Sequence, residues 1–139
     1  MKYLLDTDTC IYALKQQPAV IGVLLSKRRV DVGLSVLTEA ELRTGAAKSK
    51  SPRRTLTRLE AFLAPLQILE FASADARVYA RVRRRLEVAG RPIGPLDTLI
   101  AAHALSRSLT LVTNNVRELR RVKGLSLENW RREHTRSSR

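Results

Sequence analysis

Short hydrophobic runs alternate along the chain with longer stretches in which hydrophobic residues recur every three or four positions. The runs predict five buried strands at 2–5, 29–36, 66–71, 108–113 and 124–130. The stretches between them predict helices at 9–15, 18–27, 37–48, 53–63, 75–88 and 96–106. Strict alternation of strand and helix is typical of a parallel sheet covered on both faces. We therefore expect an α/β fold with a mostly parallel sheet of four or five strands, flanked by helices.

Composition and charge narrow the functional classes. The chain has 139 residues, of which 44% are hydrophobic, so we expect one domain over 1–130 and a flexible basic tail over 131–139. No hydrophobic run approaches the roughly 20 residues of a membrane span. The single cysteine, Cys10, and the lack of a signal-peptide pattern favour a reducing, cytoplasmic setting. The net charge of +13 makes nucleic acid the leading partner.

The first predicted strand runs directly into acidic residues. Asp6, Thr7 and Asp8 follow Tyr3–Leu5 and precede a helical pattern. A carboxylate at the end of a buried strand is costly unless it is paired or holds a cation. In open parallel sheets, ligands bind beyond the carboxyl ends of the strands. We expect Asp6 to bind a metal ion and Asp8 to cap the following helix or to lie behind Asp6, with Thr7 supporting the site.

Two further carboxylates lie on predicted helices. Glu41 shares a helix side with Leu37 and Thr44, although a solvated surface glutamate would show the same pattern. Asp97 begins a helix that is hydrophobic on nearly every side, which makes an unpaired charge expensive there. Asp97 could also cap that helix. Both residues are candidates for the same site as Asp6.

A fourth segment is expected to contribute side chains to this site. It follows the strand that ends at Thr113. Asn115 and Glu118 follow at the same edge of the sheet, where a turn and a surface helix are the alternative explanation. Oxygen side chains from several segments suit a hard cation, Mg²⁺ or alternatively Mn²⁺. His103 and His134 are badly placed as ligands, so zinc is disfavoured.

The first acidic motif also fits enzymes that form an aspartyl phosphate. In that interpretation Asp6 is the nucleophile and Ser35 supplies a second motif. Such enzymes need another pair of aspartates late in the chain, and Asp97 has no partner there. Glu41 would also have no role. The metal-ligand hypothesis uses more of the unusual residues, and we prefer it.

Four segments together resemble the motif blocks of PIN-domain ribonucleases, in particular VapC-type toxins of bacterial toxin–antitoxin pairs. The segments are YLLDTDTCIYAL, LSVLTEAELRTGAAKS, GPLDTLIAAHAL and LVTNNVRELRRVKGLSLENW. The resemblance implies a three-layer PIN-like sandwich and Mg²⁺- or Mn²⁺-dependent cleavage of RNA, with tRNA the expected substrate. It also implies inhibition by a cognate VapB-type antitoxin and a homodimer.

Carried onto this sequence, the resemblance makes Asp6, Glu41 and Asp97 metal ligands, with the Thr113 hydroxyl in support. The family often has an aspartate where this chain has Asn115, and Glu118 matches another acidic position. A water activated by the metal would attack the phosphodiester.

Basic residues would hold the RNA. The candidates lie on the predicted helices 37–48, 53–63 and 75–88 and in the loop between the first two: Arg43, Lys48, Lys50, Arg53, Arg54, Arg81, Arg84 and Arg85. A catalytically silent nucleic-acid-binding module is the alternative, because it would keep the charge and tolerate Asn115. The discriminating variant is Asp6→Asn, which abolishes activity but not RNA binding in a nuclease.

Overall fold

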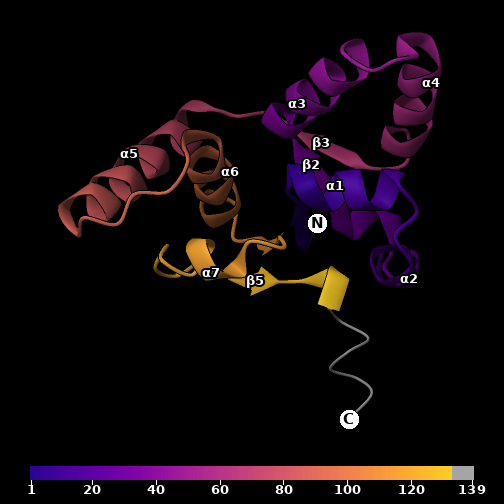
Figure 1. Cartoon of the computed structure of the whole chain (residues 1–139). Helices are drawn as coiled ribbons and strands as arrows, with labels where there is room; N and C mark the ends of the chain where they lie inside the picture. The colour runs from indigo at the N-terminus through magenta and orange to yellow at the C-terminus, as the bar shows by residue number, and fades with distance from the viewer. Residues whose placement is uncertain (133–139) are drawn as a thin grey trace.

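The fold is built on five parallel strands in the order β3-β2-β1-β4-β5 (Figure 1). The computed structural model describes residues 1–132, so most of the predicted basic tail lies outside the described residues. The strands are β1 (Tyr3–Leu5), β2 (Val32–Ser35), β3 (Gln67–Leu69), β4 (Thr110–Val112) and β5 (Leu127–Glu128). The chain winds outward from β1 through β2 to β3, then returns to the other side of β1 with β4. The strand order therefore reverses between β1 and β4.

Within residues 1–132, seven α-helices connect the strands: α1 (Thr7–Leu14), α2 (Pro18–Ser26), α3 (Val36–Ala47), α4 (Pro52–Leu63), α5 (Ser73–Val88), α6 (Pro95–Ser106) and α7 (Val116–Leu119). Proline begins three of them, at the position where its missing N–H costs nothing. Two 3₁₀ turns, η1 (Arg29–Asp31) and η2 (Trp130–Arg132), complete the described chain. Among residues 1–132, no helix has both the length and the hydrophobicity to cross a membrane.

The helices form a layer on each face of the sheet, which confirms the predicted three-layer α/β architecture. Leu5, Leu34 and Val112 belong to the core under α1 to α4. Leu4 and Leu111 point the other way, into the core under α5 and α6. Figure 1 shows these two groups of helices on opposite sides of the strands. Because neighbouring strand residues face opposite layers, both faces of β1 and β4 must be hydrophobic.

A close approach of two strands explains one glycine in the sheet. A Cβ atom added to Gly33 of β2 would lie 2.4 Å from the backbone oxygen of Gln67 in β3. A side chain therefore has no room there. On the central strand β1, Tyr3 is covered by the buried Trp130, which packs edge-to-face on it with ring centroids 5.5 Å apart.

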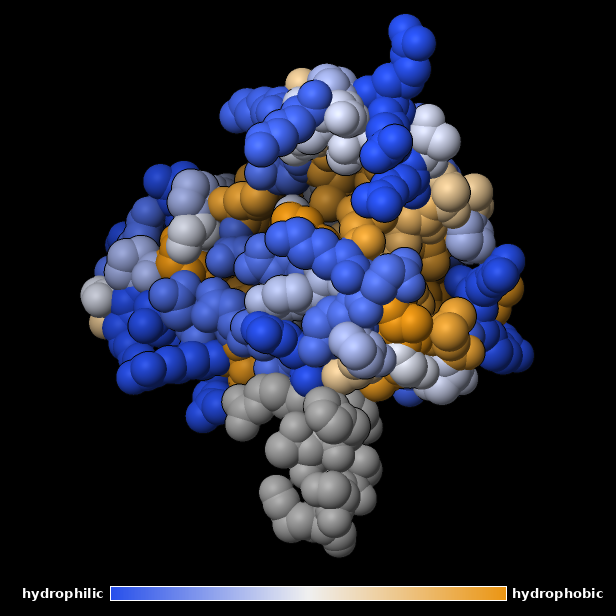
Figure 2. Space-filling model, turned by 45° about the vertical axis from the view of Figure 1, so that its right-hand side comes forward, coloured by the Kyte–Doolittle hydropathy of each residue, from blue (hydrophilic) through white to orange (hydrophobic). Residues whose placement is uncertain are grey.

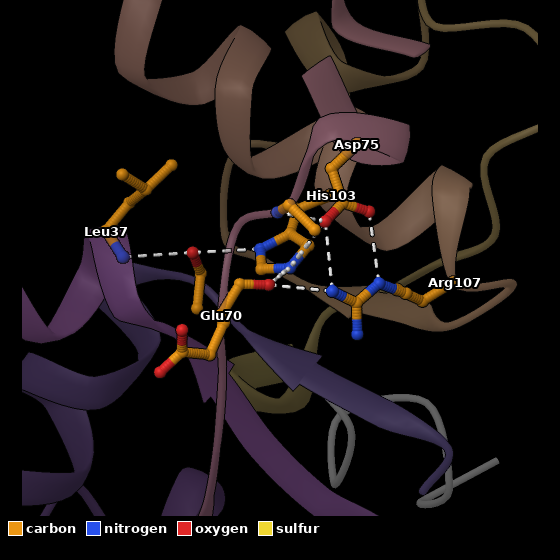
Figure 3. Close-up of polar contacts among 7 residues, drawn as sticks. Leu37, Glu70, Asp75, His103 and Arg107 are labelled. Atoms are coloured by element: carbon orange, nitrogen blue, oxygen red, sulfur yellow. Dashed lines mark hydrogen bonds and ion pairs between the residues drawn. The ribbon is translucent and has the colours of Figure 1, made fainter. Parts of the chain in front are cut away.

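A buried polar cluster joins α5, α6 and the end of β3 (Figure 3). The Asp75 carboxylate is fully buried and accepts two hydrogen bonds from the Arg107 guanidinium, at 3.0 and 2.9 Å. It also accepts one from the backbone N–H of Ala72 at 2.7 Å. Burial alone would raise the pKa of Asp75, but these hydrogen bonds outweigh burial and hold the pKa below its ordinary value.

His103 extends this cluster to the start of α3. Its Nε2 lies 3.1 Å from the Glu70 carbonyl oxygen, which can only accept, so Nε2 carries the proton. Its Nδ1 then accepts from the Ser35 hydroxyl at 2.9 Å, and the same hydroxyl accepts from the Leu37 N–H at 3.0 Å (Figure 3). Burial lowers the pKa of His103 and keeps the ring neutral. The cluster ties α6 to the N-terminus of α3.

Candidate active site

Asp6 lies at the carboxyl edge of the sheet, where the strand order reverses. Its backbone N–H donates to the Val112 carbonyl of β4 at 3.0 Å, which extends the pairing of β1 with β4 by one residue. Its Oδ1 accepts from the Thr9 N–H at 2.8 Å, so Asp6 is the N-cap of α1. The prediction that Asp8 could cap this helix is wrong, because the cap position is one residue after β1 and Asp8 already lies in the first turn.

The Thr113 hydroxyl supports the Asp6 carboxylate. Thr113 follows β4 and is fully buried, and its side chain is hydrogen-bonded to Asp6. The same hydroxyl oxygen accepts from the Asn115 N–H at 2.9 Å. Asp6 is only 4% exposed, and burial raises its pKa while the bonds from Thr113 and Thr9 oppose that rise. A carboxylate held this way is fixed in position but electrostatically strained.

A second carboxylate group forms where α6 meets α7. Asp97 lies in the first turn of α6 and is half-buried, but Gly94 is the helix N-cap, so Asp97 does not cap. The Asn115 side chain is hydrogen-bonded to Asp97 and donates through Nδ2 to Glu118 Oε1 at 3.2 Å. Burial raises the pKa of Asp97, and the charges of Asp8 and Glu118 raise it further.

Asp8 connects these two groups electrostatically. It is exposed in the first turn of α1, and its charge raises the pKa of both Asp6 and Asp97. Asp6, Asp8, Asp97 and Glu118 therefore share one region of negative potential, and we call these four residues the carboxylate cluster. They come from α1, α6, α7 and the end of β1. Mutual repulsion of this kind is relieved by a cation.

Glu41 stands apart from the carboxylate cluster. It is exposed on α3, one turn after the buried Thr38, whose hydroxyl lies 3.4 Å from that of Thr7 on α1. Thr7 thus joins α1 to α3 instead of contacting Asp6. No described contact joins Glu41 to Asp6 or Asp97. The helical spacing correctly separated Glu41 from Leu42, because Leu42 is buried and Glu41 is on another side of α3.

The described residues do not form a compact ligand set. Within residues 1–132, no three His, Cys, Asp or Glu side chains lie close enough together to hold one metal ion. The donors nevertheless suit a hard divalent cation, because all of them are oxygen atoms and two of them, Asp6 and Asp97, are carboxylates with raised pKa values. The case for a divalent cation at this site therefore rests on the oxygen donors and on the repulsion between the carboxylates.

The predicted RNA-binding residues fall into different environments. Arg43 is paired with Glu39 at 2.8 Å and with Glu60 at 2.9 Å, so its guanidinium joins α3 to α4. Lys48 and Lys50 are exposed. Arg53 and Arg54 line a shallow surface hollow of about 470 Å³ at the start of α4. The remaining three candidates are exposed on α5, at Arg81, Arg84 and Arg85.

Sequence comparison assigns the family. The PIN domain model matches residues 3–125. The chain is 40% identical over 130 residues to the tRNA(fMet)-specific endonuclease VapC of Shigella flexneri, covering 94% of this chain and 98% of that protein. It is 38% identical over 132 residues to ribonuclease VapC2 of Rickettsia felis, with the same coverage.

Solved structures agree with the sequence comparison. The DNA-bound VapBC complex of Salmonella typhimurium contains a chain with a TM-score of 0.89 and 38% identity, and the match covers 94% of this chain and 98% of that one. The Rickettsia felis VapBC2 complex, bound to a DNA fragment from its promoter, gives a TM-score of 0.86 at the same identity, covering 94% of this chain and 99% of that one. The fold, the carboxylate cluster and these relatives lead to one assignment: the chain belongs to the VapC ribonucleases of the PIN-domain family.

Proposed function

We propose that the protein is an endoribonuclease toxin that hydrolyses tRNA with Mg²⁺, or alternatively Mn²⁺, held by the carboxylate cluster and Glu41. The observation that carries this proposal is that the charge of Asp8 acts on both Asp6 and Asp97, and that of Glu118 on Asp97, at the edge where the strand order reverses. Three separate segments bring acidic side chains to this edge, although like charges repel. A stable arrangement of that kind needs a counter-charge.

The chain's own residues have separable roles in this reaction. Asp6 and Asp97 would hold the cation, with Glu41 and Glu118 able to contribute from neighbouring helices. Thr113 and Asn115 fix the orientation of the two aspartates through the hydrogen bonds described above. A bound divalent cation supplies a more acidic water and offsets negative charge on the phosphoryl oxygens. Exposed arginines and lysines would hold the RNA backbone.

The choice of tRNA rests on relatives. The Shigella flexneri relative is named a tRNA(fMet)-specific endonuclease and aligns over nearly the whole chain. We propose a cytoplasmic location, because a tRNA substrate would be met there. The charge of +13 suits any RNA and does not select one. We also propose a single domain over 1–130, and a family match over residues 3–125 supports it.

Metal removal tests the proposed activity. We expect the purified protein to cut a total tRNA pool into discrete fragments when Mg²⁺ or Mn²⁺ is present, and to leave it intact when a chelator is added. Hydrolysis by an activated water should leave 5′-phosphate and 3′-hydroxyl ends. Gel electrophoresis of end-labelled RNA checks both points. Cleavage that persists in excess chelator would contradict the proposal.

We further propose that a VapB-type antitoxin inhibits the protein, and that the toxin pairs as a homodimer. Solved structures that resemble this chain include VapBC complexes. A hydrophobic groove of about 320 Å³ between α1, α3 and α4 offers a protein partner a surface, with a floor that includes Ile11, Leu14, Leu42 and Leu59. Figure 2 turns this side of the molecule forward and shows hydrophobic residues, in orange, gathered between hydrophilic regions.

Filling this groove should weaken antitoxin binding without harming the fold. Gly45 lines the groove, and a Cβ atom there meets nothing within 4 Å. We expect Gly45→Gln to lower antitoxin affinity at least about tenfold, roughly 1.4 kcal/mol, while RNA cleavage is kept. Gly22→Gln is the matched control, because Gly22 is also a helical glycine in open space but lies outside the groove. Equal antitoxin affinity for the two variants, measured by calorimetry, would exclude the groove as the antitoxin site.

A further inference from the structure

A small basic hollow lies between α5, the end of α6 and the residues after α7. Its volume is about 70 Å³, and its apolar floor consists of Val78, Val82, Leu86, Leu105 and Val122. Four cationic side chains complete the lining: Arg81, Arg85, Arg121 and Lys123. Arg81 and Arg85 are one helical turn apart and so lie on the same side of α5. We call this feature the basic hollow.

The cations of the basic hollow lack acidic partners. No carboxylate lines the hollow, and none among residues 1–132 is within salt-bridge distance of its four cations. Arg83, on the same helix, differs in this respect because it is paired with Glu87 at 2.8 Å. Four like charges around one small volume repel each other, and an anion would relieve that repulsion.

Arg121 adds an independent observation. Its Nη1 donates to the Pro92 carbonyl oxygen at 3.1 Å, which fixes the guanidinium between α7 and the loop before α6. Its Nε is buried and has no hydrogen-bond partner among the described residues. Because this Nε is closed off from solvent, the donors of Arg121 that an anion in the hollow can reach are its terminal N–H groups.

Size and chemistry identify the ligand class. The hollow has a volume of about 70 Å³, and in this measure a single water molecule needs only about 10–15 Å³. The hollow therefore has room for a compact tetrahedral oxyanion. Guanidinium groups bind phosphate oxygens through paired, charge-assisted hydrogen bonds. The hollow is suited to a single phosphate group.

The hollow is connected to the candidate active site but separate from it. Leu105, in its floor, is eight residues after Asp97 on α6, roughly 12 Å along the helix axis. Arg121 follows Glu118 by three residues. Glu118 of α7 therefore belongs to the candidate active site, and Arg121, just after α7, belongs to the basic hollow. A phosphate in the hollow cannot be the one that is cleaved.

We propose that the basic hollow is a phosphate site that holds a backbone phosphate of the RNA substrate, away from the scissile bond. The proposal rests on the proposed function for the identity of the polymer, and on the hollow itself for the phosphate. It also divides the predicted RNA-binding residues of α5, because Arg81 and Arg85 line the hollow and Arg84 does not. The site would set the register of the RNA on the enzyme.

The test compares two double variants of the full chain. Arg81→Gln with Arg85→Gln removes two charges from the hollow, and Arg77→Gln with Arg83→Gln removes two charges from the same helix outside it. Binding of a labelled tRNA is measured by fluorescence anisotropy in chelator, over a range of salt concentrations. We expect the hollow variant to bind roughly tenfold more weakly than the control variant. Its salt slope should be lower by about one.

A chemical probe then tests whether one phosphate is involved. A single neutral methylphosphonate linkage is moved along a short RNA that the protein binds. We expect one linkage position to weaken binding to the wild type and to the control variant, but not to the hollow variant. Equal affinities and salt slopes for the two double variants would overturn the proposal. So would a hollow variant that binds RNA normally but loses affinity for the acidic surface of a protein partner.

These outcomes are separable from those of the proposed function. A wild-type protein that binds RNA through the hollow but cleaves nothing would refute the nuclease and support the hollow. A wild-type protein that cleaves RNA while the two double variants behave alike would refute the hollow and leave the nuclease intact.

Discussion

Replacing Asp6 with asparagine is expected to lower the rate of RNA cleavage by about 10³-fold or more, the effect of losing several kcal/mol of charge stabilisation by a metal ion. RNA affinity should be kept or should rise, since one negative charge leaves the carboxylate cluster. The fold should survive, because an asparagine side chain can accept the same hydrogen bond from the Thr9 N–H and is as good an N-cap as aspartate. Single-turnover cleavage and filter binding on one preparation measure both quantities.

The control for this variant is Glu87→Gln, which removes an acidic charge from an exposed ion pair on α5. Its cleavage rate should remain close to that of the wild type. A silent nucleic-acid-binding module would show no cleavage in either variant or in the wild type. An Asp6→Asn protein that cleaves normally would remove Asp6 from the mechanism.

Removing the positive charge at Arg107 should produce the largest loss of stability. Asp75 is fully buried, and Arg107 supplies two of its hydrogen bonds (Figure 3). Breaking a buried pair typically costs about 3–5 kcal/mol, and we expect about 3 kcal/mol for Arg107→Met because the Arg107 side chain is one-third exposed. Urea denaturation measures this change in the free energy of unfolding. Adding Asp75→Asn to Arg107→Met should recover part of the loss, since no buried charge then remains unpaired.

The same pair predicts how stability depends on pH. The pKa of Asp75 is below its ordinary value, so the folded protein binds fewer protons at this site than the unfolded chain. The resulting stabilisation is complete above the unfolded pKa of about 4 and is lost as the pH falls further. His103 also makes the folded protein less stable as the pH falls, starting at about pH 6.5. Its pKa is lower in the folded protein than in the unfolded chain, so the unfolded chain takes up the proton first. Asp75→Asn should flatten the loss of stability below about pH 4, and an unchanged profile would contradict this account.

The sequence predicted the strands and helices well because their hydrophobic periodicity is strong. Each of the five predicted strands exists, and each of the six predicted helices is found within two residues of its expected ends. The predicted second strand was too long at its start, where Arg29–Asp31 forms a 3₁₀ turn before β2. The four-residue α7 was considered only as an alternative, because one turn of helix leaves no periodic pattern to detect.

The candidate site was less predictable than the fold. Strand ends located Asp6 and Thr113, since the residue after a parallel strand must reach the ligand-binding edge. The hydrogen bonds of Asn115 to both Asp97 and Glu118 could not be read from the sequence, because they depend on how α7 packs against α6. The basic hollow was missed for the same reason: Arg121 and Lys123 are distant from α5 in the sequence, and periodicity does not bring them together.

The His103 cluster argues against the phosphatase alternative. In that hypothesis Ser35 would serve a phosphoryl site, but its side chain is fully buried and its hydroxyl is bonded to His103 and to the Leu37 N–H. His103 was disfavoured as a ligand, and the structure gives it a structural role between α6 and α3. The membership in the VapC ribonucleases agrees with this result.

We propose that cleavage requires a metal ion held by the carboxylate cluster. Titration of Mn²⁺ into the wild type and into Asp6→Asn, with the bound ion followed by electron paramagnetic resonance, tests this proposal. We expect bound Mn²⁺ in the wild type, a large loss of binding in Asp6→Asn, and full binding in Glu87→Gln. Equal Mn²⁺ binding by the wild type and Asp6→Asn would contradict it.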